Sequence, residues 1–396
     1  MAFILYGDGI HDDTSAIQQM IDTSCEVTLP PPSAFYLISR PLELPSNFRL
    51  VLPRFAEIRL ADGANCVMLK NKTLEAYAER TTSKLFSYLN YFSPHELCEN
   101  IEVIGGIWNF NNKNQKPNPI LSKEYNPRPY NSLGLLFYNV RNLRISSLTL
   151  KDPVNFAVTL DRVSYFKIDN ITFDFNEGNP YQSNMDGIHL CGNCNHGDIG
   201  QLFGTCYDDT VAINAEEGSR GPIMDITVRG IYTNAAYSAV RLLSASKECV
   251  IRNIHISDVH GTFYHFCISF QRHAYGTETS RGAFDSICID HIYAAKSDRH
   301  LVKFPRVFNY RNYPIIDIES KLDIRNLMIS DVYRREYVYA VPTVRIDEET
   351  VVENLILQNI TAENHTDEED MPLFVNNGTV KESTVQNLYD YKGTSL

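Results

Sequence analysis

The sequence predicts an all-β solenoid, because one short pattern recurs along most of the chain and its flanks alternate apolar and polar residues. The pattern is apolar-x-x-apolar, and successive copies begin 23 to 41 residues apart. The copies begin at Ile104, Ile145, Ile168, Ile199, Val228, Ile256, Ile289, Ile329 and Leu357. Repetition of strand and turn is typical of a solenoid, and alternation marks strands with one buried face. We expect about nine or ten coils, with Ile168, Ile199 and Val228 stacked in one column.

The two ends of the chain depart from this repeat. Residues 14–22 have helical periodicity after the N-cap candidates Asp12, Asp13 and Thr14, and we expect a short helix within an N-terminal cap region, 1–50. The polar tail, 363–396, is expected to fold over the far end, since open sheet edges invite aggregation. No Gly/Ser linker interrupts the chain, so residues 1–396 are expected to form a single domain.

Two polar segments do not fit the repeat. They span Asn111 to Ser132 and His273 to Arg281. Loops of this size on a rigid scaffold often form the walls of a functional site, and we expect both segments to project from the solenoid.

The composition limits the possible partners. The 48 Asp and Glu residues outnumber the 36 Lys and Arg residues, which gives a formal net charge of −12. Nucleic acid is not expected as a partner, because phosphate binding requires a basic surface. An anionic sugar stays compatible, since a local Arg or Lys can reverse the potential within a cleft.

The cysteines indicate neither a disulfide framework nor a metal site. Their number, nine, is odd, and they are scattered over a long chain. Cys191 and Cys194 are the only close pair, without a second Cys or His pair at zinc-ligand spacing. We expect buried free thiols, no metal ion and no cofactor.

The N-terminal residues do not resemble a leader. They lack a basic start and a long apolar run, and no stretch approaches the roughly 20 apolar residues needed to cross a bilayer. We expect a cytoplasmic protein without a membrane partner, or a secreted or virion protein if the chain is a trimmed mature form or phage-derived.

Three aspartates are spaced so that adjacent coils would bring them together. Asp186 precedes the adjacent pair Asp208 and Asp209 by 22 residues, about one coil. Unpaired carboxylates about 5 Å apart repel one another, so such a cluster needs a purpose. Glycoside hydrolases usually act with a pair of carboxyl groups whose pKa values differ. The alternative is that these residues lie in turns, where Asp is common.

These segments resemble those of a known family. Tyr6-Gly-Asp-Gly9 with Asp12-Asp-Thr14 resembles the opening of pectin-lyase-like right-handed β-helices, which include phage tailspikes and glycoside hydrolase family 28, the polygalacturonases. Asn184-Met-Asp-Gly-Ile188 resembles that family's N-T-D-G-I, and Tyr207-Asp-Asp-Thr-Val-Ala-Ile213 its G-D-D-C-I-A-I. The resemblance therefore implies a single-stranded right-handed parallel β-helix.

The resemblance also implies roles for the three aspartates in hydrolysis with inversion. Asp208 would be the general acid that protonates the leaving oxygen, and Asp186 and Asp209 would hold and deprotonate the attacking water. The physical chemistry agrees, because a carboxyl crowded by two others has a raised pKa and keeps its proton near neutral pH.

Two motifs of that family are absent from this sequence. The G-H-G segment is replaced by residues 234–243, which contain no His, and the R-x-K that grips the galacturonate carboxylate is missing from residues 266–272. Arg241 is the candidate for the lost positive charge, and His189 and Tyr237 are candidates for the polar role of the lost His. An ion-paired strand residue at position 241 and a core-side or turn histidine at position 189 are the structural alternatives.

The leading hypothesis is a glycoside hydrolase that acts on a plant or microbial polysaccharide or oligosaccharide, pectin-related and exo-acting. One alternative is a carbohydrate-binding or tailspike-like β-helix without hydrolysis. The other is a polysaccharide lyase, whose Ca²⁺ site the aspartates would resemble. The expected partner is carbohydrate, and the chain is expected to be a monomer or a homo-oligomer, a trimer if it is tailspike-like.

Overall fold

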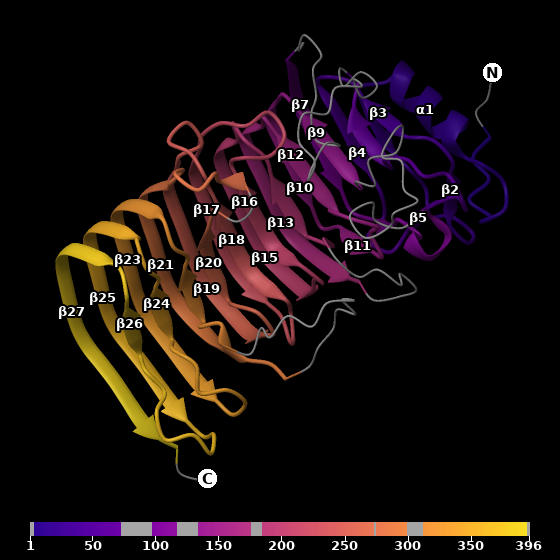
Figure 1. Ribbon diagram of the computed structural model, residues 1–396. Coiled ribbons are helices and arrows are strands. Elements are labelled where there is room, and N and C mark those ends of the chain that lie inside the picture. Colours follow the sequence, from indigo (N-terminus) through magenta and orange to yellow (C-terminus); the bar gives the residue numbers. More distant parts are fainter. Residues whose placement is uncertain are drawn as a thin grey trace.

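The protein is a right-handed parallel β-helix whose rungs stack from the N-terminal to the C-terminal end (Figure 1). The computed structural model describes residues 4–72, 97–116, 134–175, 184–272, 275–298 and 312–393. The strands form two parallel sheets, which we call the long-strand sheet and the short-strand sheet. The expected fold class is thereby confirmed.

The long-strand sheet has twelve strands on its main path and four short strands beside it. The main path is β1 (Glu26–Thr28), β4 (Phe48–Val51), β7 (Cys98–Ile104), β10 (Val140–Ser146), β13 (Ser164–Asp174), β15 (Asn195–Thr205), β17 (Ile223–Tyr232), β19 (Ile251–Phe263), β21 (Gly282–Lys296), β23 (Leu322–Glu336), β25 (Val351–Asn364) and β27 (Thr379–Lys392). The four strands beside it are β2 (Tyr36–Ile38), β5 (Glu57–Leu60), β8 (Ile107–Asn109) and β11 (Thr149–Lys151).

The short-strand sheet has eleven strands. They are β3 (Leu42–Leu44), β6 (Leu69–Asn71), β9 (Leu135–Tyr138), β12 (Val158–Asp161), β14 (Ile188–Leu190), β16 (Asp209–Asn214), β18 (Ser238–Leu243), β20 (Ile268–Gln271), β22 (Ile316–Ile318), β24 (Val344–Ile346) and β26 (Phe374–Asn376). The twelve rungs of the long-strand sheet exceed the nine or ten expected, because the expectation left out the short first two strands, β1 and β4, and the last strand, β27, whose Val385-Gln-Asn-Leu388 is a further copy of the pattern.

The recurring pattern fills the core. Ile168 pairs in register with Ile199, and Ile199 with Val228, as predicted, and all three side chains are fully buried. The column continues through Ile256, Ile289, Ile329 and Leu357. The first copy differs, since Val103 and not Ile104 occupies the column beside Ile145.

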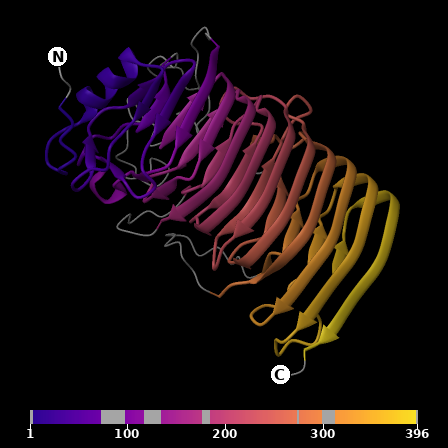
Figure 2. The ribbon, with the colours of Figure 1, turned by 180° about the vertical axis from the view of Figure 1, so that it is seen from behind.

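A bend inside each long strand explains why apolar residues recur three positions apart. The third position of the pattern has a left-handed backbone in successive rungs, for example φ +56° at Asn170, +56° at Gln201 and +54° at Asp258. Asn and Asp tolerate this region better than most residues do. The reversed residue turns the next side chain inward, so both apolar ends of the pattern face the core. Figure 2 shows the long strands from behind, side by side and curved.

The two ends of the stack differ. Helix α1 (Thr14–Thr23) forms as predicted and buries Ile17 and Ile21 against the first rungs. The tail was expected to fold over the far end, but β26 and β27 instead add further parallel strands, and β27 pairs with β25 along its length. The tail extends the helix because its backbone continues the ladder of hydrogen bonds.

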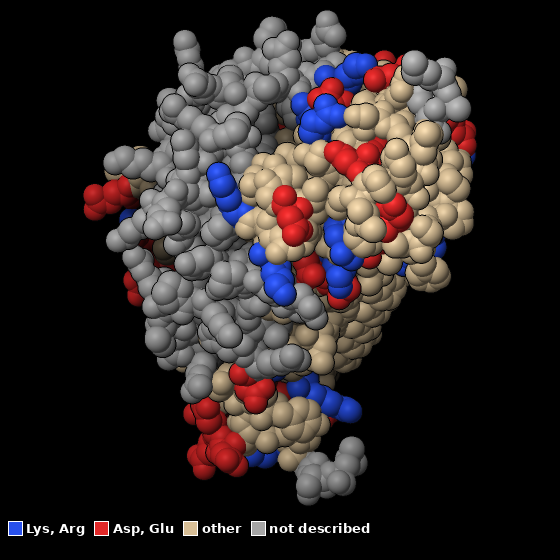
Figure 3. Space-filling model, turned by 90° about the vertical axis from the view of Figure 1, so that its right-hand side faces the viewer, with Lys and Arg blue, Asp and Glu red and all other residues tan. Residues whose placement is uncertain are grey.

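The surface and the cysteines fit the composition. Figure 3 shows acidic and basic side chains interspersed over the described part of the N-terminal face. Near the N-terminal end of the chain, Lys70 pairs with Glu43 and Lys72 with Asp22. All nine cysteines are free thiols, and six of them are buried. In the described segments, no helix has the length and apolarity that a membrane span requires.

Candidate active site

Three carboxylates meet where two adjacent strands of the short-strand sheet begin. Asp186 lies two residues before β14, Asp208 immediately precedes β16, and Asp209 is the first residue of β16. One oxygen from each carboxylate comes within 4.8 Å of the others, and all three residues are buried. The adjacent coils therefore bring together the three aspartates whose sequence spacing predicted a shared site.

Gly187 permits this close approach. Its backbone N–H donates to the Asp209 carbonyl at 2.9 Å, which fixes the two aspartate segments side by side. A Cβ at this position would lie 2.6 Å from the Thr210 carbonyl oxygen and 2.7 Å from the Phe173 ring. Only glycine fits without displacing the neighbouring rung, which explains the Gly of the motif.

Arg241, on β18, neutralises part of the negative charge. Its Nε lies 3.1 Å from Oδ2 of Asp209, and its Nη2 lies 3.4 Å from Oδ1 of Asp208. Asp208 also accepts a hydrogen bond from the Asn184 backbone N–H at 3.1 Å, and Asp209 accepts one from the Ser238 hydroxyl. Arg241 is thus an ion-paired residue within the cluster, as the structural alternative for this position held.

Burial and mutual repulsion give the carboxyl groups of the cluster different pKa values. Burial, followed by the charges of Asp209 and Asp186, raises the pKa of Asp208 well above its ordinary value. Burial also raises the pKa of Asp209, but Arg241 opposes the shift, and the result is about 6. Near neutral pH the pair therefore combines a protonated carboxyl at Asp208 with an ionised one at Asp209.

His189 lies behind Asp186, inside the protein. Its Nδ1 is 2.6 Å from Oδ2 of Asp186 and its Nε2 is 2.7 Å from Oε2 of Glu217, while its ring stacks on Phe156 at 3.7 Å. Burial alone would lower the pKa of His189, but Glu217 and Asp186 raise it to about 9. With 1% of its surface exposed, His189 contacts the cluster from its protected side.

Tyr237 stands one rung beyond Asp208, because Asp209 pairs in register with Ser238. It is 6% exposed, and its ring lies 5.0 Å from that of His265, which follows on the next rung. The short-strand sheet thus places Asp208, Tyr237 and His265 in one row along the helix axis.

Several polar partners of the cluster were not singled out from the sequence. Glu217 accepts hydrogen bonds from the Tyr275 hydroxyl at 2.5 Å and from Asn214 at 3.2 Å. Tyr275 belongs to the segment expected to project from His273, of which residues 275–281 are described; residues 117–132 of the other expected loop lie outside the described part. Strand register does not identify Glu217, because this residue lies in the connection between β16 and β17.

Two buried groups of side chains have ligand types and spacing that could hold a metal ion, and the partly exposed His255, Cys288 and Asp290 form a further such group among the described residues. Asp186, Asp208 and Asp209 form the first, and His189, Cys191 and Glu217 the second. In the first group Arg241 already supplies a positive charge. In the second, both His189 nitrogens engage carboxylates and burial raises the pKa of the Cys191 thiol, whereas zinc binds a thiolate. The chemistry of both groups therefore favours side-chain partners over a metal ion.

Comparison with known proteins gives a family match for the central part of the chain. Residues 98–260 match the model of Glycosyl hydrolases family 28, and this range contains all six candidate residues. A search of curated proteins found no significant match.

Similar solved structures share the fold at low sequence identity. The surface adhesin PfbA of Streptococcus pneumoniae is 14% identical, with a TM-score of 0.50 over 98% of this chain and 92% of the adhesin. A tailspike of Escherichia coli bacteriophage HK620 is 13% identical, with a TM-score of 0.63 over 97% of this chain and 62% of the tailspike. The family 28 exopolygalacturonase of Yersinia enterocolitica is 12% identical, with a TM-score of 0.53 over 100% of this chain and 78% of the enzyme.

The fold and the site together define a class of protein. The chain is a right-handed parallel β-helix of the pectin-lyase-like type. Its central coils, residues 98–260, match the model of Glycosyl hydrolases family 28, and the tailspike and the exopolygalacturonase share its fold.

Proposed function

We propose that the protein hydrolyses glycosidic bonds of a plant or microbial oligosaccharide or polysaccharide at the Asp186–Asp208–Asp209 cluster. The observation that supports this proposal is the division of acidity within the pair, since Asp208 keeps its proton while Asp209 has a pKa of about 6. Glycoside hydrolysis needs one carboxylic acid and one carboxylate on either side of the bond.

In the proposed reaction Asp208 transfers its proton to the glycosidic oxygen as the bond from that oxygen to the anomeric carbon breaks. A water molecule held by Asp186 and Asp209 attacks the anomeric carbon from the opposite face, and one of these carboxylates takes its proton. The products are a released alcohol group and a new reducing end with inverted configuration. Asp208 must then regain a proton before the next turnover.

The spacing of the carboxylates does not by itself favour inversion. Their oxygens approach within 4.8 Å, whereas inverting glycosidases usually separate the two groups by roughly 6.5–9.5 Å. The family that the motifs resemble inverts with closer carboxylates, and we propose inversion on that resemblance. Proton NMR of the first product anomer tests it directly, since retention would appear as the opposite anomer.

We further propose that the substrate is pectin-related and is attacked from its end. The proposal rests on the family 28 match, because no feature of the described cluster identifies the sugar. The experiment is incubation with pectic and other plant cell-wall oligosaccharides, with product masses followed over time and Asp208→Asn as the control. Release of single terminal units by the wild type alone supports exo-hydrolysis, and a ladder of internal fragments contradicts it.

A carbohydrate-binding protein without hydrolysis is the second candidate, because the G-H-G and R-x-K motifs are absent. A tailspike of bacteriophage HK620 has been solved with a bound pentasaccharide. A glycan that stays bound to the protein, with no cleavage product detected by mass spectrometry, would favour this candidate. A product that absorbs as an unsaturated sugar, formed only with added Ca²⁺, would instead identify a lyase.

A further inference from the structure

A continuous chain of hydrogen bonds leads away from Asp186. Its Oδ2 lies 2.6 Å from Nδ1 of His189, and Nε2 of His189 lies 2.7 Å from Oε2 of Glu217. The Tyr275 hydroxyl donates to Oε1 of Glu217 at 2.5 Å. The chain therefore connects the carboxylate cluster with the segment that contains Tyr275, between β20 and β21.

This chain is protected from water except at its far end. Asp186, His189 and Glu217 are 3%, 1% and 4% exposed, whereas Tyr275 is half-buried. Hydrogen bonds to charged groups are strong where water does not compete, and a buried charge that loses its partner is costly. Solvent therefore cannot replace a member of the chain that is removed.

The surroundings restrict His189 to one orientation. Its ring stacks on Phe156 at 3.7 Å, both of its nitrogens face carboxylates, and Glu217 is held in addition by Asn214 at 3.2 Å. Asp186 consequently turns Oδ2 toward His189. Its Oδ1 is buried and has no hydrogen-bond partner among the described residues, so this oxygen is left to accept a hydrogen bond from the attacking water.

Glu217 also determines the charge of His189. Burial lowers the pKa of the imidazole, and the charge of Glu217 is the largest effect that raises it, to about 9. Asp186 acts in the same direction, and the buried Asp161 and Asp209 also interact with the His189 charge. The imidazolium in turn lowers the pKa of Asp209, so Glu217 influences the carboxylate cluster from behind.

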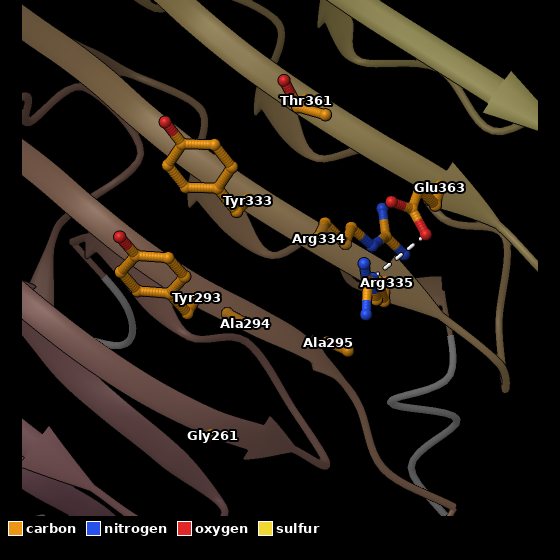
Figure 4. Close-up of a pocket in the computed structure, with 9 residues that line it drawn as sticks. All are labelled: Gly261, Tyr293, Ala294, Ala295, Tyr333, Arg334, Arg335, Thr361 and Glu363. Atoms are coloured by element: carbon orange, nitrogen blue, oxygen red, sulfur yellow. Dashed lines mark ion pairs between the residues drawn. The ribbon is translucent and has the colours of Figure 1, made fainter.

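A second glutamate–histidine pair, on the long-strand sheet, provides a contrast. Glu363 borders a groove of about 440 Å³, and its Oε2 lies 3.0 Å from Nε of Arg335 (Figure 4) and 3.2 Å from Nε2 of His365. The side chains of Glu363 and Arg335 are 30% and 65% exposed, and exposed ion pairs usually contribute little. Among the described residues, by contrast, no Lys or Arg pairs with Glu217, and His189 is its counter-charge.

We propose that Glu217 and Tyr275 are positioning residues for the proposed hydrolysis. Glu217 fixes His189 and supplies its counter-charge, and Tyr275 holds Glu217 in place, so that Asp186 presents one defined oxygen to the attacking water. Both residues act through His189. The inference rests on the proposed function and extends its machinery to the segment that contains Tyr275.

The test uses two variants and two matched controls. Glu217→Gln keeps the shape of the side chain and removes its charge, and Tyr275→Phe removes only a hydroxyl. Glu363→Gln removes the carboxylate partner of a histidine far from the cluster. Tyr36→Phe removes a buried tyrosine hydroxyl that donates to the Pro30 carbonyl at 2.6 Å.

Two readouts are measured for each protein. The first is kcat and KM between pH 4 and 9, on a substrate that the wild type cleaves. The second is the titration of His189 by ¹⁵N NMR of histidine-labelled protein, with the signal assigned by its loss in His189→Gln. The second readout does not depend on hydrolysis.

We expect Glu217→Gln to lower kcat about 10- to 100-fold and to change KM less than about threefold, as misplacement of a catalytic group does. Its acidic limb should move upward, because Asp209 loses the charge of His189, and the NMR midpoint of His189 should fall by at least about one pH unit. Tyr275→Phe should lower kcat about 3- to 10-fold with KM unchanged. Both controls should stay within about twofold of the wild type.

Three results would overturn the inference. They are wild-type kcat in Tyr275→Phe, an unchanged His189 titration in Glu217→Gln, and a rise in KM alone, which would make Tyr275 or Glu217 a substrate contact. An equal loss of kcat in the controls would also overturn it, because the effect would then be general destabilisation.

The inference and the proposed function can fail separately. Hydrolysis by the wild type with variants that match it would refute only the positioning role. Absence of hydrolysis by the wild type, with the expected fall of the His189 midpoint in Glu217→Gln, would refute the proposed function and leave the link between Glu217 and His189 established.

Discussion

Nε of Arg241 lies 3.1 Å from Oδ2 of the fully buried Asp209, on the neighbouring strand of the short-strand sheet. The guanidinium that was expected to receive a substrate carboxylate is therefore already engaged by carboxylates of the protein. Its main effect is to lower the free-energy cost of holding ionised carboxylates in a buried cluster.

Asp208→Asn should reduce turnover by roughly three orders of magnitude or more on any substrate that the wild type cleaves, because general acid catalysis typically contributes 10²–10⁴-fold. The fold should persist, since the amide keeps the shape and the side chain serves no core packing. Steady-state kinetics beside circular dichroism provide the measurement. Near-wild-type turnover would remove Asp208 from the mechanism.

The rate should have a bell-shaped dependence on pH. It should rise as Asp209 ionises around pH 6 and fall where Asp208 loses its proton, at a pH well above its ordinary value. The two limbs belong to the coupled pair and not to single residues. A profile of kcat/KM that is flat from pH 4 to 8 would contradict the assignment of the acid and base.

Stability should fall as the pH rises through the acid range. The folded pKa of Asp209, about 6, lies above its ordinary value of 3.8, so the folded state binds the extra proton and its advantage is lost between about pH 4 and 6. His189 acts in the same direction at higher pH, because its folded pKa of about 9 lies above its ordinary value of 6.5, so its stabilisation is lost between about pH 6.5 and 9. Denaturant midpoints from pH 4 to 10 measure both effects, and Asp209→Asn should flatten the acidic part only.

His189→Gln should lower kcat roughly 10- to 100-fold and leave KM nearly unchanged, because the imidazolium positions Asp186 without reaching substrate. Loss of its positive charge should also move the acidic limb of the pH profile upward, since the remaining carboxylates become harder to ionise. His255→Gln is the control, an exposed histidine paired with Asp290 away from the site. A purely structural role would reduce stability without moving that limb.

The sequence predicted the fold well because the physical cause of its repeat leaves a recognisable pattern of apolar residues. The left-handed residue at the third position, as at Asn170 or Asp331, brings residues three positions apart to the same side of the strand. Both of these residues must then be apolar, and this spacing can be recognised in the sequence. The structure of the tail was harder to predict, because Val380, Val385 and Leu388 continue the core columns of β25 but stand among polar neighbours in the sequence. Residues 379–392 therefore resembled a polar tail.

The candidate site was predictable only as far as one-coil spacing determines proximity. The proximity of Asp186 and Asp209 follows from the register of β14 and β16. The direction in which His189 points does not follow from spacing, because its two carboxylate partners lie 3 residues before and 28 residues after it, the latter outside any strand. The same is true of Arg241, whose pairing depends on side-chain conformation.

Ile199→Ala should destabilise the helix by about 2–5 kcal/mol, the usual range for a fully buried aliphatic residue whose loss leaves a cavity. Ile356→Ala is the matched control, because that side chain is 40% exposed and its change should stay within about 0.5 kcal/mol. Equilibrium unfolding in urea compares the two. Equal effects would contradict the assignment of the column to the core.

Arg241→Ala should impair cleavage of acidic and neutral oligosaccharides to a similar degree, because Arg241 faces Asp208 and Asp209 and not the substrate's charge. A bidentate Arg–carboxylate contact with substrate would be worth a few kcal/mol, or roughly a hundredfold in rate. Without that contact, and without an R-x-K motif, plain oligogalacturonides should be cleaved more slowly than neutral or rhamnose-containing oligosaccharides. The measurement is kcat/KM for each class with wild type, Arg241→Ala and Arg241→Lys, where Lys restores the charge inside the cluster. A loss confined to oligogalacturonides in Arg241→Ala would show that Arg241 grips the substrate, and efficient cleavage of plain oligogalacturonides by the wild type would contradict the preference for neutral sugars.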